Sequence, residues 1–103
     1  MRDDSFLDYV LDQLGMAGDV TARRMFGAHG LYLDGAFFAI VSDDRLYFKT
    51  DEASREDYRA RGMRPFQPSP RQTLTSYYEV PPEILDDRAL LGAWARRAAT
   101  TRR

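Results

Sequence analysis

The feature that most constrains the fold is a segment rich in glycine and aromatic residues, residues 22–38. Within it, Asp34-Gly35 separates two apolar runs, a pattern that predicts a tight β-hairpin. The sequence also predicts chain reversals at 27–30 and 42–44, which leave strands over 21–26, 31–33, 37–41 and 45–49. Because connections this short join antiparallel neighbours, we expect an antiparallel meander in an α+β fold.

Helical periodicity predicts three helices around these strands. Residues 5–14 carry an apolar stripe and are expected to end at Gly15. Residues 51–61 are helical but mostly polar, so this helix is expected to pack lightly and to end at Gly62. The last helix covers 87–98, and its predicted apolar face consists of Leu90, Leu91, Trp94, Ala95 and Ala98.

The second half of the chain adds strands to the sheet. The sequence predicts a short strand over residues 63–67 and a second strand over residues 73–80, which ends at Pro81-Pro82. Between them, Pro68-Ser69-Pro70 is predicted to form an exposed loop. We expect one domain over residues 1–103, with a core over about 5–98 and a frayed, arginine-rich C-terminal tail. Its antiparallel sheet has about five strands, on which the first and last helices pack.

Composition excludes several classes of protein. The chain has no cysteine, which excludes disulfides and thiolate metal sites. Its formal net charge of −1 argues against a dedicated nucleic-acid binder. No apolar run approaches the ~18 residues of a membrane span, and the first residues lack the order of a signal peptide. We therefore expect a cytoplasmic protein with no membrane contact.

Candidate chemical groups are sparse. His29 is the only histidine, and no residues at metal-ligand spacing accompany it, so it is interpreted as a turn residue. The paired acids lie at turns or helix starts, where they cap backbone N–H groups. The glycines at 27 and 30 lack a phosphate-loop pattern. We predict no catalytic residue, no cofactor and no metal.

Aromatic and basic residues on the predicted strands leave alternatives open. Strand alternation places about half of the aromatics, such as Tyr32, Tyr47 and one of Tyr77 and Tyr78, on the face away from the core. Such a face suits plain packing, a protein or dimer contact, or stacking of single-stranded bases. The neighbours Arg23 and Arg24 are predicted to point to opposite faces, one in an ion pair and the other at the surface or against a partner.

Three blocks of the sequence together resemble the TfoX/Sxy N-terminal domain family. They are residues 23–27 with Gly30-Leu31-Tyr32, residues 62–66, and residues 76–81. The resemblance implies an α-β-β-β-α-β-β-α layout and a non-enzymatic regulator linked to bacterial competence. The family-motif residues are Met25, Phe26, Gly27, Gly30, Tyr32, Gly35, Tyr77, Tyr78 and Pro81, and the candidate interaction residues are Arg23, Arg24, Arg96 and Arg97.

The resemblance also frames the expected function. Well-known members carry a second, C-terminal domain and act with a transcription regulator, the cyclic-AMP receptor protein. This chain is expected to be a stand-alone, single-domain member that works as a regulatory adaptor through protein–protein contact, with homodimerisation left open. The alternative is a weak DNA-associated regulator in which the arginine-rich C-terminal helix and tail contact phosphates.

Overall fold

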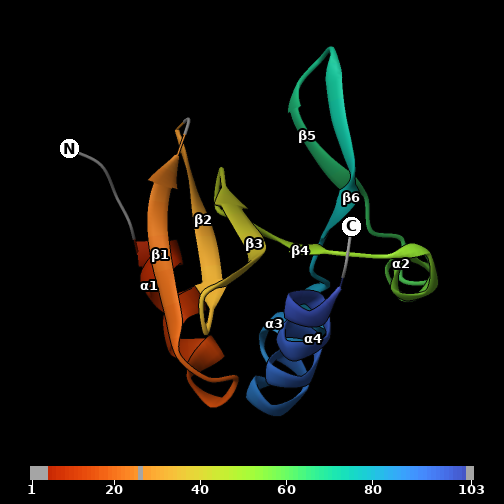
Figure 1. The fold of residues 1–103 in the computed structure, drawn as a ribbon. Coiled ribbons are helices and arrows are strands. Elements are labelled where there is room, and N and C mark those ends of the chain that lie inside the picture. The colour runs from red at the N-terminus through yellow and green to blue at the C-terminus, as the bar shows by residue number, and fades with distance from the viewer. Residues whose placement is uncertain (1–4, 26, 102–103) are drawn as a thin grey trace.

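The computed structural model describes residues 5–25 and 27–101 and has an α+β fold (Figure 1). The elements are α1 (Ser5–Gln13), the 3₁₀ turn η1 (Leu14–Met16), β1 (Val20–Met25), β2 (Ala28–Leu33), β3 (Ala36–Ser42), β4 (Arg45–Lys49), α2 (Glu52–Arg59), β5 (Pro65–Ser69), β6 (Gln72–Glu79), α3 (Pro82–Leu85) and α4 (Arg88–Thr100). The motif residue Phe26 and the tail residues Arg102 and Arg103 lie outside the described residues.

The sheet has six strands in the part of the chain that the structure describes. Their order is β1-β2-β3-β4-β6-β5, and every neighbouring pair is antiparallel. The meander β1–β3 and the hairpin β5–β6 stand on either side of β4 (Figure 1). The sequence indicated six strand segments and all six occur, so the stated total of about five strands was one too low. The family layout allowed three strands before the middle helix, whereas β4 is a full central strand paired with both β3 and β6.

The predicted tight turns are confirmed, with one correction. Asp34 and Gly35 have φ values of 50° and 88°, and Asp43 and Asp44 have 52° and 58°, as two-residue hairpin loops of the primed type require. The first reversal is shorter than predicted. Because Met25 already pairs with residue 28, the strand β2 includes His29, which is therefore not a turn residue.

The strand β5 corrects the expectation of an exposed loop at Pro68-Ser69-Pro70. Pro68 and Ser69 lie inside β5, and Ser69 pairs with Gln72. Proline cannot donate to a sheet ladder, so it is confined to edge strands and bulges. This strand meets both conditions, since it is the outermost strand and its register shifts twice.

The main core lies between one face of the sheet and the helices α1, α3 and α4. It joins Val10 and Leu14 of the N-terminal segment to the strand residues Leu31 and Phe48, and to Leu91 of α4. The predicted end of the first helix at Gly15 is wrong, because the chain continues as η1 to residue 16.

The helix α4 meets the core through a narrower stripe than predicted. Leu91, Ala95 and Ala98 follow i, i+4 and i+7 spacing and are buried. Leu90 is 46% exposed, so its assignment to the apolar face was wrong. It falls one residue off this stripe, in the first turn, where its N–H donates to the capping carboxylate of Asp87 at 3.1 Å.

The polar helix α2 is anchored at two points. Asp51 and Ser54 form a capping box, in which the Ser54 N–H donates to Asp51 Oδ1 at 2.8 Å and the Asp51 N–H donates to Ser54 Oγ at 3.0 Å. Tyr58 is buried and packs edge-on against Trp94 of α4, with ring centroids 4.9 Å apart. Ala53 and Ala60 stay exposed, in keeping with a lightly packed helix.

Candidate functional site

The face of the sheet opposite the helices carries a second, smaller apolar cluster. Ile40, Tyr47 and Phe66 are 7%, 9% and 7% exposed and form its centre. The half-buried side chains of Ala28, Phe37, Leu74 and Tyr77 pack against them. We call this surface the helix-free face. No helix among the described residues contributes to this cluster, so its burial comes from side chains of the sheet itself.

The strand register explains why these residues share a face. Arg23, Gly30, Ile40 and Tyr47 lie opposite one another across β1, β2, β3 and β4. In antiparallel strands, directly opposed side chains project to the same side. The family-motif position Gly30 therefore stands in the middle of the helix-free face.

Aromatic rings line this face in two groups. The rings of Tyr32 and Phe37 lie 5.3 Å apart, and Phe37 lies 5.9 Å from Tyr77. Tyr47 packs on Phe66 at 4.6 Å. Burial raises the pKa of both Tyr47 and Tyr77 above the usual value for tyrosine. These rings therefore form a partly desolvated apolar surface.

A groove of about 300 Å³ opens on the helix-free face. Its lining residues are Met25, Ala28, Ile40, Phe66, Pro68, Gln72 and Leu74. They come from β1, β2 and β3 on one side and from the β5–β6 hairpin on the other, which are the two sides seen in Figure 1. Residues of both edge strands, β1 and β5, therefore line the same largely apolar groove.

The motif glycine Gly30 shapes one wall of this groove. A Cβ atom at this position would lie 2.4 Å from Met25 Cε and 2.7 Å from Phe37 Cε1. The absence of a side chain allows Met25 and Phe37 to close over the strand. The other motif glycines have different roles, since Gly27 and Gly35 have φ values of 79° and 88° with open space around them.

The other motif residues divide between the two faces. Tyr32 and Tyr77 belong to the helix-free face, whereas Tyr78 is buried in the main core. Pro81 is fully buried and precedes α3 as its N-cap residue. Tyr47, expected on the outer surface, is on the helix-free face but buried, because Phe66 covers it.

The two candidate arginines of β1 form no ion pair with another residue that the structure describes. The guanidinium carbon of Arg23 lies 6.0 Å from the centre of the Tyr32 ring. Arg24 lies opposite His29, which lies opposite Val41 of the main core, so Arg24 is on the other face of the sheet from Arg23. The prediction that one of the two arginines pairs with an acid is not confirmed, because the ion pairs among the described residues all involve other arginines.

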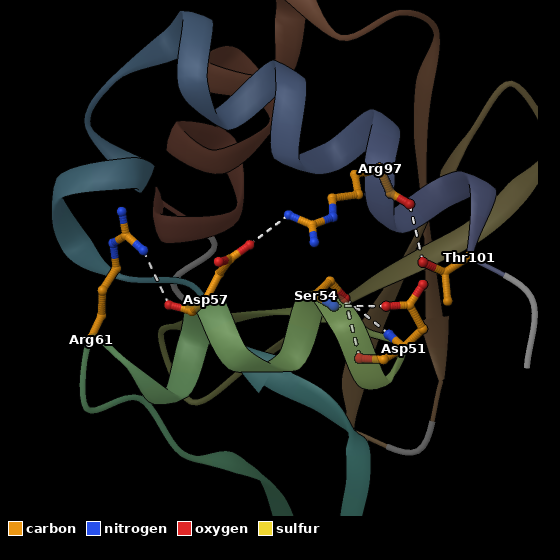
Figure 2. Close-up of polar contacts among 6 residues, drawn as sticks. All are labelled: Asp51, Ser54, Asp57, Arg61, Arg97 and Thr101. Atoms are coloured by element: carbon orange, nitrogen blue, oxygen red, sulfur yellow. Dashed lines mark hydrogen bonds and ion pairs between the residues drawn. The ribbon is translucent and has the colours of Figure 1, made fainter.

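The candidate arginines of α4 are occupied within the domain. Arg97 Nη1 lies 2.7 Å from Asp57 Oδ2 of α2 (Figure 2). The backbone oxygen of Arg97 accepts a hydrogen bond from Thr101 Oγ1 at 3.1 Å. Arg96 Nη1 donates to the backbone oxygen of Met16 at 3.2 Å. These contacts link α4 to α2 and to η1. Because both members of the Arg97–Asp57 pair are about half exposed, this pair contributes at most about 1 kcal/mol.

Residues 5–25 and 27–101 hold neither a metal-ligating cluster nor a membrane-spanning helix. No group of three His, Cys, Asp or Glu side chains there is placed to hold a metal ion. His29 lies within β2, paired with Arg24 and Val41 rather than with acids. None of the helices in the same ranges has the length and apolar character that a membrane span requires.

The sequence alone did not indicate that Ile40, Phe66 and Leu74 belong to a candidate surface. One available signal was the uninterrupted apolar run Phe37–Val41, because a strand that packs on both faces lacks the polar alternation of a half-buried strand. No local signal predicted the groove, since its two walls are separated in sequence by the whole of β4 and α2.

Comparison with known proteins identifies the family. A family model for the TfoX N-terminal domain matches residues 12–101. An uncharacterised 12.7 kDa protein encoded in the trpE 5′ region of Spirochaeta aurantia is 37% identical over 54 residues. That match covers 52% of this chain and 47% of the relative, so it spans about half of each protein. Because the family model covers nearly the whole chain, the chain belongs to the TfoX N-terminal domain family, which is associated with competence regulation.

Proposed function

We propose that this chain is a non-enzymatic regulatory adaptor that acts by protein–protein contact through the helix-free face. The observation that carries the proposal is the apolar groove between β1–β3 and the β5–β6 hairpin. The family association with competence regulation suggests a transcription regulator as the class of partner. Membership of a regulatory domain family also supports a role without catalysis.

The lining of the groove favours an apolar side chain over a small polar ligand. Small-molecule sites combine apolar walls with a few convergent polar groups that fix the ligand's orientation. Of the seven lining residues, only Gln72 has a polar side chain. An apolar side chain anchored in a partner protein needs no such groups, because its own backbone fixes its position.

Contacts within the domain disfavour the alternative role in DNA binding. Arg96 and Arg97 bind Met16 and Asp57, and Arg88 lies 3.3 Å from Asp12 Oδ2 and donates to its backbone oxygen at 2.9 Å. Binding DNA phosphates through these arginines would compete with all three contacts. The formal net charge of −1 gives no general attraction to nucleic acid.

Affinity capture from an extract of the organism that encodes the chain tests this function. The tagged chain is incubated with the extract with and without nuclease, at low and moderate salt. The Leu74→Glu variant places a charge in the groove, and Thr75→Glu is its matched control because Thr75 is exposed and is not a lining residue. Both variants are first shown to melt like the parent.

The proposal predicts one specific protein that survives nuclease and moderate salt. This protein should be lost from Leu74→Glu and retained by Thr75→Glu. Recovery of nucleic acid alone, lost on raising the salt, would contradict the adaptor function and favour phosphate contacts. Equal capture by both variants would place the contact elsewhere on the domain.

A further inference from the structure

Among the described residues, β1 is an edge strand that pairs with β2 alone, and no register shift interrupts that pairing. It is the outermost strand, and its six residues, Val20–Met25, contain neither proline nor glycine. The opposite edge, β5, contains Pro65 and Pro68 and two register shifts, which are devices that prevent edge pairing. The edge β1 lacks these devices but carries two arginines, and charges on an edge strand disfavour any added strand that does not neutralise them.

The register shows which backbone groups of β1 face outward. The Asp34 N–H donates to the Asp19 backbone oxygen at 2.8 Å, and the pairing continues without a shift to the end of β1. Hydrogen-bonded and non-hydrogen-bonded pairs alternate in antiparallel strands. The N–H and C=O groups of Val20, Ala22 and Arg24 therefore point away from β2, toward the open edge.

Most arginine side chains in the described residues have an ion pair or a hydrogen bond within the domain, and the exceptions are Arg23 and Arg24 of β1 together with Arg64 and Arg71. Arg45, Arg59, Arg61, Arg88 and Arg97 form ion pairs, and Arg55 and Arg96 donate side-chain hydrogen bonds. The Arg23 and Arg24 side chains have no ion pair or hydrogen bond to another described residue and are exposed. Consecutive strand residues point to opposite faces, so two cations flank the open edge, one on each face.

On the helix-free face, the apolar groove adjoins the end of β1. Met25 lies two residues beyond Arg23, on the same side of β1, and lines the groove. A segment that runs along β1 would therefore meet a cation on either face and then an apolar hollow.

We infer that β1 accepts an extended acidic segment of a partner protein as an added strand. This inference rests on the proposed role in protein contact. The segment would carry two adjacent carboxylates, one toward Arg23 and one toward Arg24, and a large apolar residue next to them that enters the groove beside Met25. Main-chain hydrogen bonds to Val20, Ala22 and Arg24 would supply affinity, and the side chains would supply selectivity.

The same observations disfavour a second copy of this chain as the occupant. Its own edge, Val20-Thr21-Ala22-Arg23-Arg24-Met25, contains no acid. Pairing two such edges would gather four guanidinium groups at one junction, and like charges across strands are destabilising. A nucleic acid would satisfy the cations but would leave the outward N–H and C=O ladder of β1 unused.

Selection from a displayed library of short linear peptides on the immobilised full chain tests the inference. Enriched peptides are resynthesised, and their affinity is measured for the parent chain and for two double variants. Arg23→Glu with Arg24→Glu reverses the β1 cations. Arg64→Glu with Arg71→Glu is the matched control, because these exposed arginines also have no ion pair among the described residues and the change in net charge is the same.

Enriched peptides should carry adjacent acids beside a large apolar residue. Their affinity should fall at least about tenfold for the β1 double variant and by much less for the control. Ala22→Pro removes an outward N–H without touching a charge, and it should also abolish binding while the fold persists. The amides of Val20, Ala22 and Arg24 should become protected from hydrogen exchange in the complex.

Several results would overturn the inference. They are a library with no enrichment, enriched peptides without acids, or equal loss of affinity in both double variants. If both β1 variants still capture the protein partner normally, the proposed adaptor function stands and the inference of strand addition fails. Binding of single-stranded oligonucleotides that is lost from the β1 double variant would reassign these arginines to phosphate and contradict both proposals.

Discussion

The substitution Gly30→Ala tests whether the groove wall is packed as described. The new Cβ would lie 2.4 Å from Met25 Cε and 2.7 Å from Phe37 Cε1, whereas carbon atoms in contact lie about 3.5–4.0 Å apart. Both side chains must therefore move by roughly 1 Å. Met25 is flexible, but the Phe37 ring is held between Tyr32 and Tyr77.

Two opposing effects set the size of the change. Overpacking of a well-packed site costs about 1–3 kcal/mol. The φ of Gly30 is not positive, so alanine fits the backbone and restores about 0.4–1 kcal/mol by restricting the unfolded chain. The net loss should be about 1–2 kcal/mol, which lowers the Tm of a domain of this size by roughly 5–15 °C.

Calorimetry and urea unfolding measure this loss, and a double-mutant cycle assigns its cause. Met25→Ala removes the closest clashing atom, so it should cost less in the Gly30→Ala background than in the parent, with a coupling of about 0.5 kcal/mol or more. An unchanged or higher Tm for Gly30→Ala would refute the reasoning. Strict additivity of the two substitutions would show that Met25 does not pack over Gly30.

Three further predictions concern the helices and the response to pH. Leu91→Ala should cost about 2–5 kcal/mol in urea unfolding, whereas the exposed neighbour Leu90→Ala should cost under about 1 kcal/mol; similar losses would place both leucines in the core. Burial raises the pKa of Tyr58, so the folded state keeps its proton longer than the unfolded state and stability falls as pH rises above about 10; Tyr58→Phe should flatten that decline in urea melts. The hydrogen bond from the Ser54 N–H lowers the pKa of Asp51, so the free energy of unfolding should fall as the pH drops below about 4. Urea melts of Asp51→Asn should show a weaker fall over this pH range, and an unchanged fall would contradict the prediction.

Local chemistry was sufficient to predict much of the fold. Asp34-Gly35 and Asp43-Asp44 adopt positive φ where the turn residues indicated, because few other residue types tolerate this conformation. The meander and the three longer helices follow from such turns and from the spacing of apolar residues. The errors arose where tertiary position decides the outcome. Pro68 fits a strand only because β5 is an edge, and the side of α4 that docks on the core buries Leu91 and exposes Leu90.

The candidate surface could be predicted only in part. Alternation correctly placed Tyr32 away from the core but left open which of Tyr77 and Tyr78 shares its face, and the structure places Tyr77 there. The groove depends on the curl of the sheet, which brings Met25 of β1 near Phe66 of β5, and no pattern within either strand encodes that approach. The internal partners of Arg96 and Arg97 are likewise long-range contacts, with residues on η1 and α2.

Amide hydrogen exchange of the chain with its captured protein partner tests the central claim most directly. If the helix-free face is the contact, exchange should slow in β1, β2 and the β5–β6 hairpin, and the amides of α2 and α4 should be unaffected. Protection confined to α4, with the strands unchanged, would contradict the account and place the contact on the arginine-bearing helix.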